Sequence, residues 1–467
     1  MRAPSRTALH LAALAAGAVL GACGSGLYDA SGVPVLEDGN GDTCGAEQIT
    51  CGGVCTTPSA SQCGAACQDC TASVGVPANA VAACLGVGTA GTCGYTCTGG
   101  YLKCADGCCG ATALAAGDRF TCALLERTGE VACWGANDTG QLGLGSTLAQ
   151  PEPARLALGA PAIAIGAGVS HACAVLQGGA VRCWGANAQG QVTGGAGVPA
   201  LAPASSPVTA GATAVAAGLG HTCALLDTGA VQCWGANDLG QRGPGPGQPI
   251  PSGATALAAG RNHACALVGD QVRCWGANGS GQLGATPDGS GIAVAIPSGI
   301  RHLAAGGDHT CASTGNSTGQ PLDDALRCWG DSVGTGWRLA APQLTPAIPM
   351  KSETDSTIRD RVPMLAVGPQ FVCVSNKGES VECLGANGSG QLGGDIAGRI
   401  GETVVVPLPR TIPAARALAA GSTHACAALG PADDGRLRCW GDNDAGQLGD
   451  GTTVDPGLGI LVTPLGR

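Results

Sequence analysis

The chain has 467 residues and a formal net charge of −10, with 12% charged and 3% aromatic residues. Glycine supplies 81 residues, a density that argues against helical architectures because each interior glycine costs a helix about 1 kcal/mol relative to alanine. The acidic balance argues against a nucleic-acid partner, since binding phosphates requires a basic surface that releases counterions.

Residues 1–22 have the pattern of an export signal. Arg2 and Arg6 precede an apolar run from Leu11 to Leu20 that is too short to span a membrane, and small residues lead to Cys23. This resembles a bacterial lipoprotein signal, which implies cleavage before Cys23 and lipidation of its thiol. The alternative is an ordinary secretory peptide cut at the same bond. We expect an exported protein, lipid-anchored at the bacterial cell envelope (outer membrane or cell surface), that meets the membrane only through its anchor.

Residues 23–43 are expected to carry the lipid and form a flexible acidic tether, because they are rich in Gly, Asp and Ser. Asp38, Asn40 and Asp42 match the first ligand positions of a calcium-binding loop. Thr43 and Ile49 then replace the glycine and the bidentate glutamate that such a loop needs. A solvated linker is the preferred interpretation.

Residues 44–110 are expected to form a separate module that disulfides hold together. The segment offers few large apolar side chains for a core, but it contains twelve cysteines, at 44, 51, 55, 63, 67, 70, 84, 93, 97, 104, 108 and 109. Zinc is the alternative for the Cys67-x-x-Cys70 pair, but the segment has no histidine and export favours oxidation. The connectivity stays open.

From residue 111 to the end, one unit recurs seven times. Its clearest copy is CALLERTGEVACWGANDTGQLG, from Cys122 to Gly143, and the first cysteines of the copies stand at 122, 173, 223, 265, 311, 373 and 426. In each unit two apolar runs of strand length flank a short polar turn, which predicts a β-hairpin. A period near 50 residues suits four short strands per unit, arranged radially with the other units.

The frame HxCAL, a turn, then VxCWGxNxxGQLG resembles the repeat of the regulator of chromosome condensation family. This resemblance implies an all-β fold, a seven-bladed β-propeller over residues 111–467, preceded by the small disulfide-rich module. The copies depart from the frame at Leu384, where the others have tryptophan, and after Gly330. In the nuclear branch of that family the propeller promotes nucleotide exchange on a small GTPase, an activity we do not expect of an exported chain.

Each repeat contributes two cysteines that are predicted to be opposed across its hairpin. Loops at 269–270, 227–229 and 126–129 then have common hairpin lengths, and directly opposed residues are near the spacing of a disulfide. The alternative is buried free thiols. The predicted disulfides join Cys122 to Cys133, Cys173 to Cys183, Cys223 to Cys233, Cys265 to Cys274, Cys311 to Cys328, Cys373 to Cys383 and Cys426 to Cys439.

Three other residue types recur at fixed positions in the repeats. Histidine precedes the first cysteine by two at 171, 221, 263, 309 and 424, and because Phe120 and Phe371 take the same position we expect packing rather than a metal girdle. The tryptophans at 134, 184, 234, 275, 329 and 440 are expected in the core between adjacent blades. The asparagines at 137, 187, 237, 278, 387 and 443 are expected to cap the turn after the strand.

Two irregularities bear on function. Gly330 to Gly334 match the G-x-S-x-G pattern of a nucleophilic serine, but they fall where the other units have a turn and no helix can follow. A charged insertion between the fifth and sixth units is the candidate binding loop, with a neutral surface loop as the alternative. Its candidate residues are Lys351, Glu353, Asp355, Arg359, Asp360 and Arg361.

The sequence therefore favours a monomeric, non-enzymatic cell-surface lipoprotein whose propeller binds an extracellular protein or glycan, with no cofactor and no metal. A hydrolase with a site at the mouth of the central channel and a structural spacer of the envelope are the alternatives. The terminal segment LVTPLGR could complete either the last blade or the first.

Overall fold

The computed structural model describes residues 101–105, 107–244, 248–284, 300–314, 326–331, 364–375, 381–393, 415–429 and 436–456, and the backbone of short strands elsewhere. The chain divides into two compact units, residues 1–98 with Arg467 and residues 99–466. Cys23 and residues 351–361 lie outside the described residues, so lipidation and the binding-loop hypothesis stay predictions. Within the described part, no helix has the length and apolar character needed to cross a membrane.

The first unit contains short antiparallel ladders. Its strands are β1 (Leu27–Tyr28), β2 (Pro34–Glu37) and β3 (Thr43–Cys44) in one sheet, then the pairs β4 (Ile49–Cys51) with β5 (Val54–Thr56) and β6 (Ala80–Leu85) with β7 (Thr92–Cys97). The segment expected to be a tether thus has secondary structure, although each of its ladders has only two residue pairs. The apolar run PVL within β2 is consistent with this pairing.

The second unit begins with the hairpin of β8 (Leu102–Cys104) and β9 (Gly107–Cys109) and continues, over the described strands, into seven sheets. We number these sheets as blades 1 to 7. Blade 1 holds β10 (Ala111–Ala116), β11 (Phe120–Leu125), β12 (Val131–Gly135) and β13 (Gln150–Arg155), and blade 2 holds β14 (Ala162–Ala167), β15 (His171–Leu176), β16 (Val181–Gly185) and β17 (Ala200–Ser205). Blade 3 holds β18 (Ala212–Ala217), β19 (His221–Leu226) and β20 (Val231–Gly235), and blade 4 holds β21 (Ala254–Ala259), β22 (His263–Val268), β23 (Gln271–Gly276) and β24 (Ala293–Val294).

The remaining blades follow the same order. Blade 5 holds β25 (Ile300–Gly306), β26 (His309–Thr314), β27 (Leu326–Gly330) and β28 (Gln343–Ala347), and blade 6 holds β29 (Met364–Val367), β30 (Phe371–Ser375), β31 (Ser380–Gly385) and β32 (Thr403–Pro407). Blade 7 holds β33 (Ala417–Ala420), β34 (His424–Leu429) and β35 (Arg436–Gly441). Within each blade the strands pair antiparallel in chain order, which confirms the all-β prediction.

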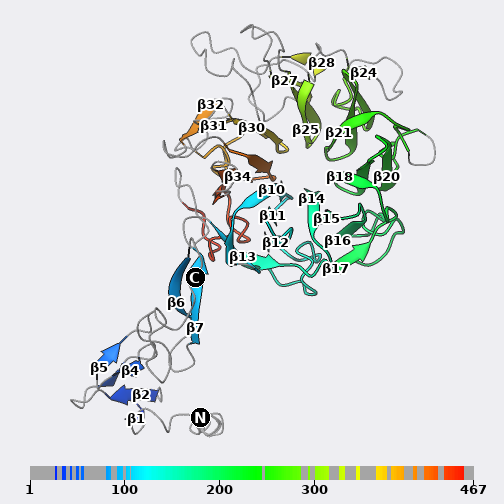
Figure 1. The fold of residues 1–467 in the computed structure, drawn as a ribbon. Helices are drawn as coiled ribbons and strands as arrows, with labels where there is room; N and C mark the ends of the chain where they lie inside the picture. Colours follow the sequence, from blue (N-terminus) through cyan, green and yellow to red (C-terminus); the bar gives the residue numbers. More distant parts are fainter. Residues whose placement is uncertain are drawn as a thin grey trace, which may run out of the picture. The chain divides into compact units, whose positions relative to one another are not determined.

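The blades are arranged as a closed ring (Figure 1). The first strand of each blade contacts the first strand of the next, from β10 through β14, β18, β21, β25 and β29 to β33, and β33 contacts β10. These strands surround the centre, so the structure is a propeller. The C-terminal segment LVTPLGR lies outside the described residues, whereas the four strands of blade 1 all come from residues 111–155.

Each seam between neighbouring blades contains one apolar cluster. The cluster between blades 1 and 2, for example, joins Phe120 and Leu142 to Leu176 and Trp184. The repeat tryptophans are 0–4% exposed and each lies in the seam with the preceding blade, as expected. Because each buries about 150–250 Å² of side chain, these residues dominate the contact between blades. Leu384 takes the tryptophan position in blade 6 and is also buried.

The second unit begins before the domain boundary expected after residue 110. Leu102, Cys104 and Cys109 are buried in the same apolar cluster as Trp134 of blade 1 and the cysteines of blade 7. Cys104 and Cys109 form a disulfide, and Arg127 donates from Nη2 to the Cys108 carbonyl at 3.1 Å. The β8–β9 hairpin therefore packs as part of the propeller unit.

Candidate binding end of the propeller

Two kinds of loop share one end of the ring, which we call the loop end. The first kind joins the first and second strands of a blade, and the second kind follows the third strand. In blade 1 these are residues 117–119 and 136–149, and they meet because β11 and β12 are antiparallel, with Phe120 opposite Gly135. The opposite end carries the hairpin turns between second and third strands, and we call it the hairpin end.

The seven predicted cysteine pairs form disulfides across these hairpins. Each pair is directly opposed in the register, with Cα atoms 4.0–4.1 Å apart. The intervening turns have the loops expected from the spacing: Val268 pairs with Gln271 around residues 269–270, and the Leu226 amide donates to the Ala230 carbonyl around residues 227–229. The cysteines are therefore structural groups inside the blades.

A pair of amide side chains builds the loop of the second kind in every blade except blade 5, whose sequence lacks both residues. The Oδ1 atom of the repeat asparagine accepts the backbone N–H five residues on, at 2.9–3.0 Å, as from Leu142 to Asn137. The Oε1 atom of the following glutamine accepts the N–H two residues before it, at 2.8–2.9 Å, as from Thr139 to Gln141. These bonds confirm the expected asparagine caps and hold the loops in one conformation.

The glutamine has a second role that the sequence analysis missed. Its backbone carbonyl accepts the Nε1–H of the next blade's tryptophan at 2.9–3.0 Å, as Gln141 does from Trp184 and Gln447 does from Trp134. The loop of one blade is thus attached to the core of its neighbour. The recurrence of GQ in the repeats was the available signal, but it does not indicate which blade the carbonyl reaches.

The repeat histidines lie fully buried in the seams. The Nε2 atoms of His171, His263 and His424 are 2.8–2.9 Å from the threonine Oγ1 of the next blade. Each of those hydroxyls donates to the carbonyl of a repeat glutamine, so Nε2 must carry the proton and donate to the hydroxyl. The Nδ1 atoms then point at packed groups, with no hydrogen-bond partner among the described residues.

Burial strongly disfavours the charged form of these imidazoles. It lowers the pKa of His171 and His263 to about 3, with added repulsion from His221, and lowers the pKa of His221, His309 and His424 to about 4. Within the described residues, no group of three or more His, Cys, Asp or Glu could hold a metal ion. The arrangement supports packing as the role of these histidines.

The mouth of the central channel at the loop end is a cavity of about 500 Å³, counting the part that is open to solvent. Its wall is mostly Gly and Ala from the ends of the first strands. Glycine is required there: a Cβ on Gly218 would lie 2.3 Å from the His221 ring and 2.6 Å from the Gly260 carbonyl. Asp118, Arg261 and Ser422 supply the only charged or hydroxyl side chains of the described lining.

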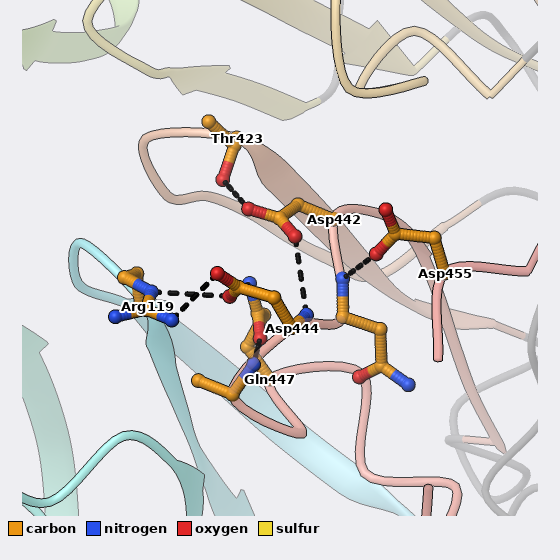
Figure 2. Close-up of polar contacts among 8 residues, drawn as sticks. Arg119, Thr423, Asp442, Asp444, Gln447 and Asp455 are labelled. Atoms are coloured by element: carbon orange, nitrogen blue, oxygen red, sulfur yellow. Dashed lines mark hydrogen bonds and ion pairs between the residues drawn. The ribbon is translucent and has the colours of Figure 1, made fainter. Parts of the chain in front are cut away.

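Figure 2 shows the part of the loop end where blade 7 meets blade 1. Arg119 pairs with both oxygens of Asp444, at 2.6 and 3.1 Å, and the Gln447 amide also donates to that carboxylate. Asp442 accepts from the Thr423 hydroxyl at 2.9 Å and from the Asp444 amide at 3.1 Å. Partial burial alone would raise the pKa of Asp444, but the hydrogen bonds from Arg119 and Gln447 outweigh it and lower this pKa. The Asp444 carboxylate in turn raises the pKa of Arg119.

The loop end is strongly acidic. Its described loops contain three arginines, Arg119, Arg242 and Arg261, against nine carboxylates at Asp118, Asp138, Asp238, Asp308, Asp331, Asp442, Asp444, Asp450 and Asp455. Arginines instead gather toward the hairpin end, where they precede the second cysteine of a pair at 182, 273, 327 and 438. Among the described residues of the propeller, most carboxylates therefore lie toward the loop end and most basic side chains toward the hairpin end, which net charge alone did not reveal.

The loop end also carries most of the exposed apolar side chains. Of the seven large hydrophobic residues that are exposed in the described part of the chain, six lie in its loops or at a strand end beside them: Leu148, Val198, Leu201, Leu219, Leu239 and Val454. The seventh, Ile163, lies in β14. Exposed apolar groups interspersed with charges are typical of a protein-binding surface.

Only Gly330 and Asp331 of the G-x-S-x-G match lie within the described residues. Gly330 ends β27, and the Asp331 amide donates to the Asp308 carbonyl as part of the loop-end turn. Ser332 lies outside the described residues. At the channel mouth Ser422 is near His424 in sequence, but that imidazole is buried in the seam and bonded to Thr121.

Comparisons with known proteins agree with this architecture. Five segments match a model of the regulator of chromosome condensation (RCC1) repeat, residues 111–141, 162–191, 212–241, 254–282 and 415–447, and a second RCC1 repeat model matches 128–175. Human WBSCR16 is similar in structure at 21% identity, with a TM-score of 0.58 over 72% of this chain and 94% of that one. Yeast RCC1 (Prp20), in a crystal structure with Kap60, is similar at 20% identity, with a TM-score of 0.57 over 72% of this chain and 83% of that one.

Among curated proteins, no sequence matches this chain. The structural likenesses, both below 25% identity, concern the fold, whereas the repeat matches fall on the hairpins and asparagine loops described above. This chain therefore contains repeats of the RCC1 family.

Proposed function

We propose that this protein is an exported, lipid-anchored binding scaffold that holds an extracellular protein partner at the loop end of its propeller. The observation that carries the proposal is the coincidence, on one end, of nine carboxylates and six exposed apolar side chains. A surface of this kind is complementary to a partner that presents basic residues around an apolar patch. Loops fixed by internal hydrogen bonds would bind with little loss of conformational freedom.

Support also comes from the fold. A similar propeller, yeast RCC1, is seen with a protein, Kap60, bound. A glycan is the second ligand class that the sequence left open, but the loop-end apolar residues are aliphatic, and the described loops place no tryptophan there: the repeat tryptophans are buried in the seams. This favours a protein partner over a sugar.

The hydrolase alternative receives less support at the channel mouth. A nucleophilic hydroxyl needs a base within hydrogen-bond reach. Ser422 is the hydroxyl of the described lining, and His424 is engaged with Thr121 in the seam. A structural spacer of the envelope would have no reason to place exposed aliphatic residues on one end.

The test is capture of partners from cell-envelope extract and culture medium with the full oxidised protein. The loop-end variant changes Leu148, Val198 and Leu239 to serine. Its matched control changes Ile163, the exposed apolar residue outside those loops, to serine. We expect the wild-type protein and the control to retain a partner with a basic surface that the loop-end variant loses, and equal capture by all three would refute the loop end as the site.

A deletion of residues 351–361 tests the candidate binding loop in the same assay. Loss of the partner on deletion, with retention by the control, would assign recognition to the insertion. Retention would leave the insertion a neutral surface loop. Anchoring is tested separately by mass spectrometry of the mature N-terminus, where Cys23→Ser should remove the acyl chains and release the protein from membranes.

A further inference from the structure

The cavity at the channel mouth contains two opposite charges on opposite walls. Asp118 follows β10 of blade 1, and Arg261 follows β21 of blade 4. Blades 2 and 3 lie between Asp118 and Arg261 on one side of the ring, and blades 5, 6 and 7 lie between them on the other side. The two residues are therefore nearly as far apart around the channel as the ring allows (Figure 1). The cavity therefore has an anionic wall and a cationic wall.

Within the described residues, neither Asp118 nor Arg261 forms an ion pair with a neighbouring side chain. Arg119, the cation next to Asp118, pairs at 2.6 Å with Asp444, so its charge is already balanced. Asp308, on the blade next to Arg261, accepts a hydrogen bond from Gln282. In the described residues, the Asp118 and Arg261 side chains make no hydrogen bond or ion pair with protein groups. Both are at least partly exposed in the cavity.

The two charges are held in place by the backbone. The Asp118 amide donates to the Val169 carbonyl of blade 2 at 3.1 Å, and the Arg261 amide donates to the Gly307 carbonyl of blade 5 at 2.7 Å. Similar bonds link Val169 to Gly218 and Leu219 to Arg261. This belt of blade-to-blade hydrogen bonds fixes the positions from which the side chains extend. The site is thus preorganised before any ligand arrives.

The rest of the wall limits what can fit between the charges. Apart from Asp118, Arg261 and Ser422, the described lining is made of Gly, Ala, Val and Pro. Such a wall accepts small apolar groups and offers few side-chain hydrogen bonds. A single anion or cation would leave one of the two charges unmatched.

We propose that the channel mouth binds a short zwitterionic peptide with small side chains, its ammonium group at Asp118 and its carboxylate at Arg261. The carboxylate suits the guanidinium because that group can donate two parallel hydrogen bonds. Methyl side chains pack on the Ala and Gly wall. The site is separate from the apolar surface of the outer loops and does not depend on a protein partner.

The probes are free alanine peptides of two to five residues, titrated by calorimetry into the full oxidised protein. An extended chain spans about 3.3–3.6 Å per residue, so the preferred length reports the distance between the two charges. We expect saturable binding with one preferred length. Acetylation of the amino end or amidation of the carboxyl end should each weaken binding about tenfold or more, because each removes one charge-assisted contact.

The variants are Asp118→Asn and Arg261→Gln, with Asp238→Asn and Arg242→Gln as matched controls on the same end but outside the cavity. Each cavity variant should weaken the free peptide about tenfold and respond less to the corresponding blocked peptide. The controls should bind like wild type. If a cavity variant fails to fold, the blocked peptides still test both contacts on the wild-type protein.

Two results would overturn the proposal. One is the lack of saturable binding by any peptide of the series up to millimolar concentration. The other is binding that blocking either end, or changing Asp118 or Arg261, leaves within twofold of wild type.

Discussion

Acidification should destabilise the propeller through its buried histidines, and this loss of stability should begin at a pH well above that at which carboxylates titrate. The five seam histidines have pKa values lowered to about 3 or 4 in the folded protein because they are buried. In the unfolded chain they titrate near 6.5. A lowered folded pKa means that the unfolded state binds more protons as the pH falls below 6.5. Stability is therefore full above that pH and is lost progressively toward pH 4.

The magnitude follows from the linkage relation. Each histidine removes about 1.4 kcal/mol per pH unit below 6.5, hence about 2 kcal/mol at pH 5. Five such groups approach about 10 kcal/mol, which is comparable to the whole stability of a typical domain, about 5–15 kcal/mol. A proton added to Nδ1 of His171 finds no acceptor among the described residues, and a Cβ on Gly168 would already lie 2.9 Å from this Nδ1 atom. We expect cooperative unfolding to begin near pH 5 even with the disulfides intact.

The assay is thermal unfolding by circular dichroism at constant ionic strength between pH 7.5 and 4.5. The informative variant is His171→Phe with Thr222→Ala, which copies the pair Phe120 and Ala172 already present at another seam. In this double variant, the dependence of the melting temperature on pH should be about a fifth weaker than in the wild-type protein. Thr222→Ala alone is the control, because it keeps the titrating imidazole and should keep the slope. A melting temperature that is the same at pH 7 and pH 5, or a slope unchanged in the double variant, would refute the reasoning.

Three further predictions concern the seams and hairpins and can be checked by chemical denaturation. Trp184→Ala should cost about 3–5 kcal/mol, because it empties a fully buried site and frees the Gln141 carbonyl; a cost below about 1 kcal/mol would contradict the seam packing. Glu126→Gln should cost about 1–3 kcal/mol, since it breaks the ion pair between two mostly buried side chains, Glu126 and Arg416, whereas Asp444→Asn, at a half-exposed pair, should cost less than about 1 kcal/mol; the reverse order would contradict the burial argument. Removing one hairpin disulfide, by Cys173→Ala with Cys183→Ala, should lower the free energy of unfolding by about 2–3 kcal/mol. An unchanged free energy of unfolding would indicate that this disulfide does not stabilise the fold.

Most of the blade could be predicted from the sequence because its contacts are local. Two cysteines 9 to 17 residues apart define a hairpin, and the hairpin defines its register, so the opposition of Cys265 and Cys274 followed from the spacing. The substitution of Phe at the histidine position indicated packing, and the buried seam confirms it. The Oδ1 atoms of the asparagine caps also act locally, because each accepts a backbone N–H only five residues along the chain.

The contacts between blades could not be predicted, because they depend on how the ring brings repeats together. Thr222 lies beside His171 across a seam, and no pattern within one repeat indicates that. A weak signal exists: a threonine after the histidine position occurs at 121, 222 and 310, and the preceding blade has a histidine each time. The charge separation between the ends is similarly hidden. It becomes visible only when the strand directions assign each loop to an end.

The seam between blades 7 and 1 shows how the ring is closed without a shared strand in the described residues. Thr121 and His424 are 303 residues apart, whereas the equivalent pair at the seam between blades 2 and 3 is 51 residues apart. Loop-closure entropy grows with the logarithm of this separation, so the sixfold longer loop costs only about 1.6 kcal/mol more. The contacts found at this seam and at no other described seam are expected to contribute a free energy similar to this cost.

Those contacts lie at both ends of the seam. At the loop end Arg119 pairs with Asp444, and at the hairpin end Glu126 pairs with Arg416, whose side chain is 16% exposed. Between them, Leu102 and the Cys104–Cys109 disulfide extend the apolar cluster. The last strands of the cysteine-rich region thus stabilise the place where the ring closes. A propeller lacking residues 99–110 should therefore unfold more readily at this seam. Amide hydrogen exchange should then show that β10 and β33 lose protection before the other strands. A uniform loss of protection over all blades would argue against this role.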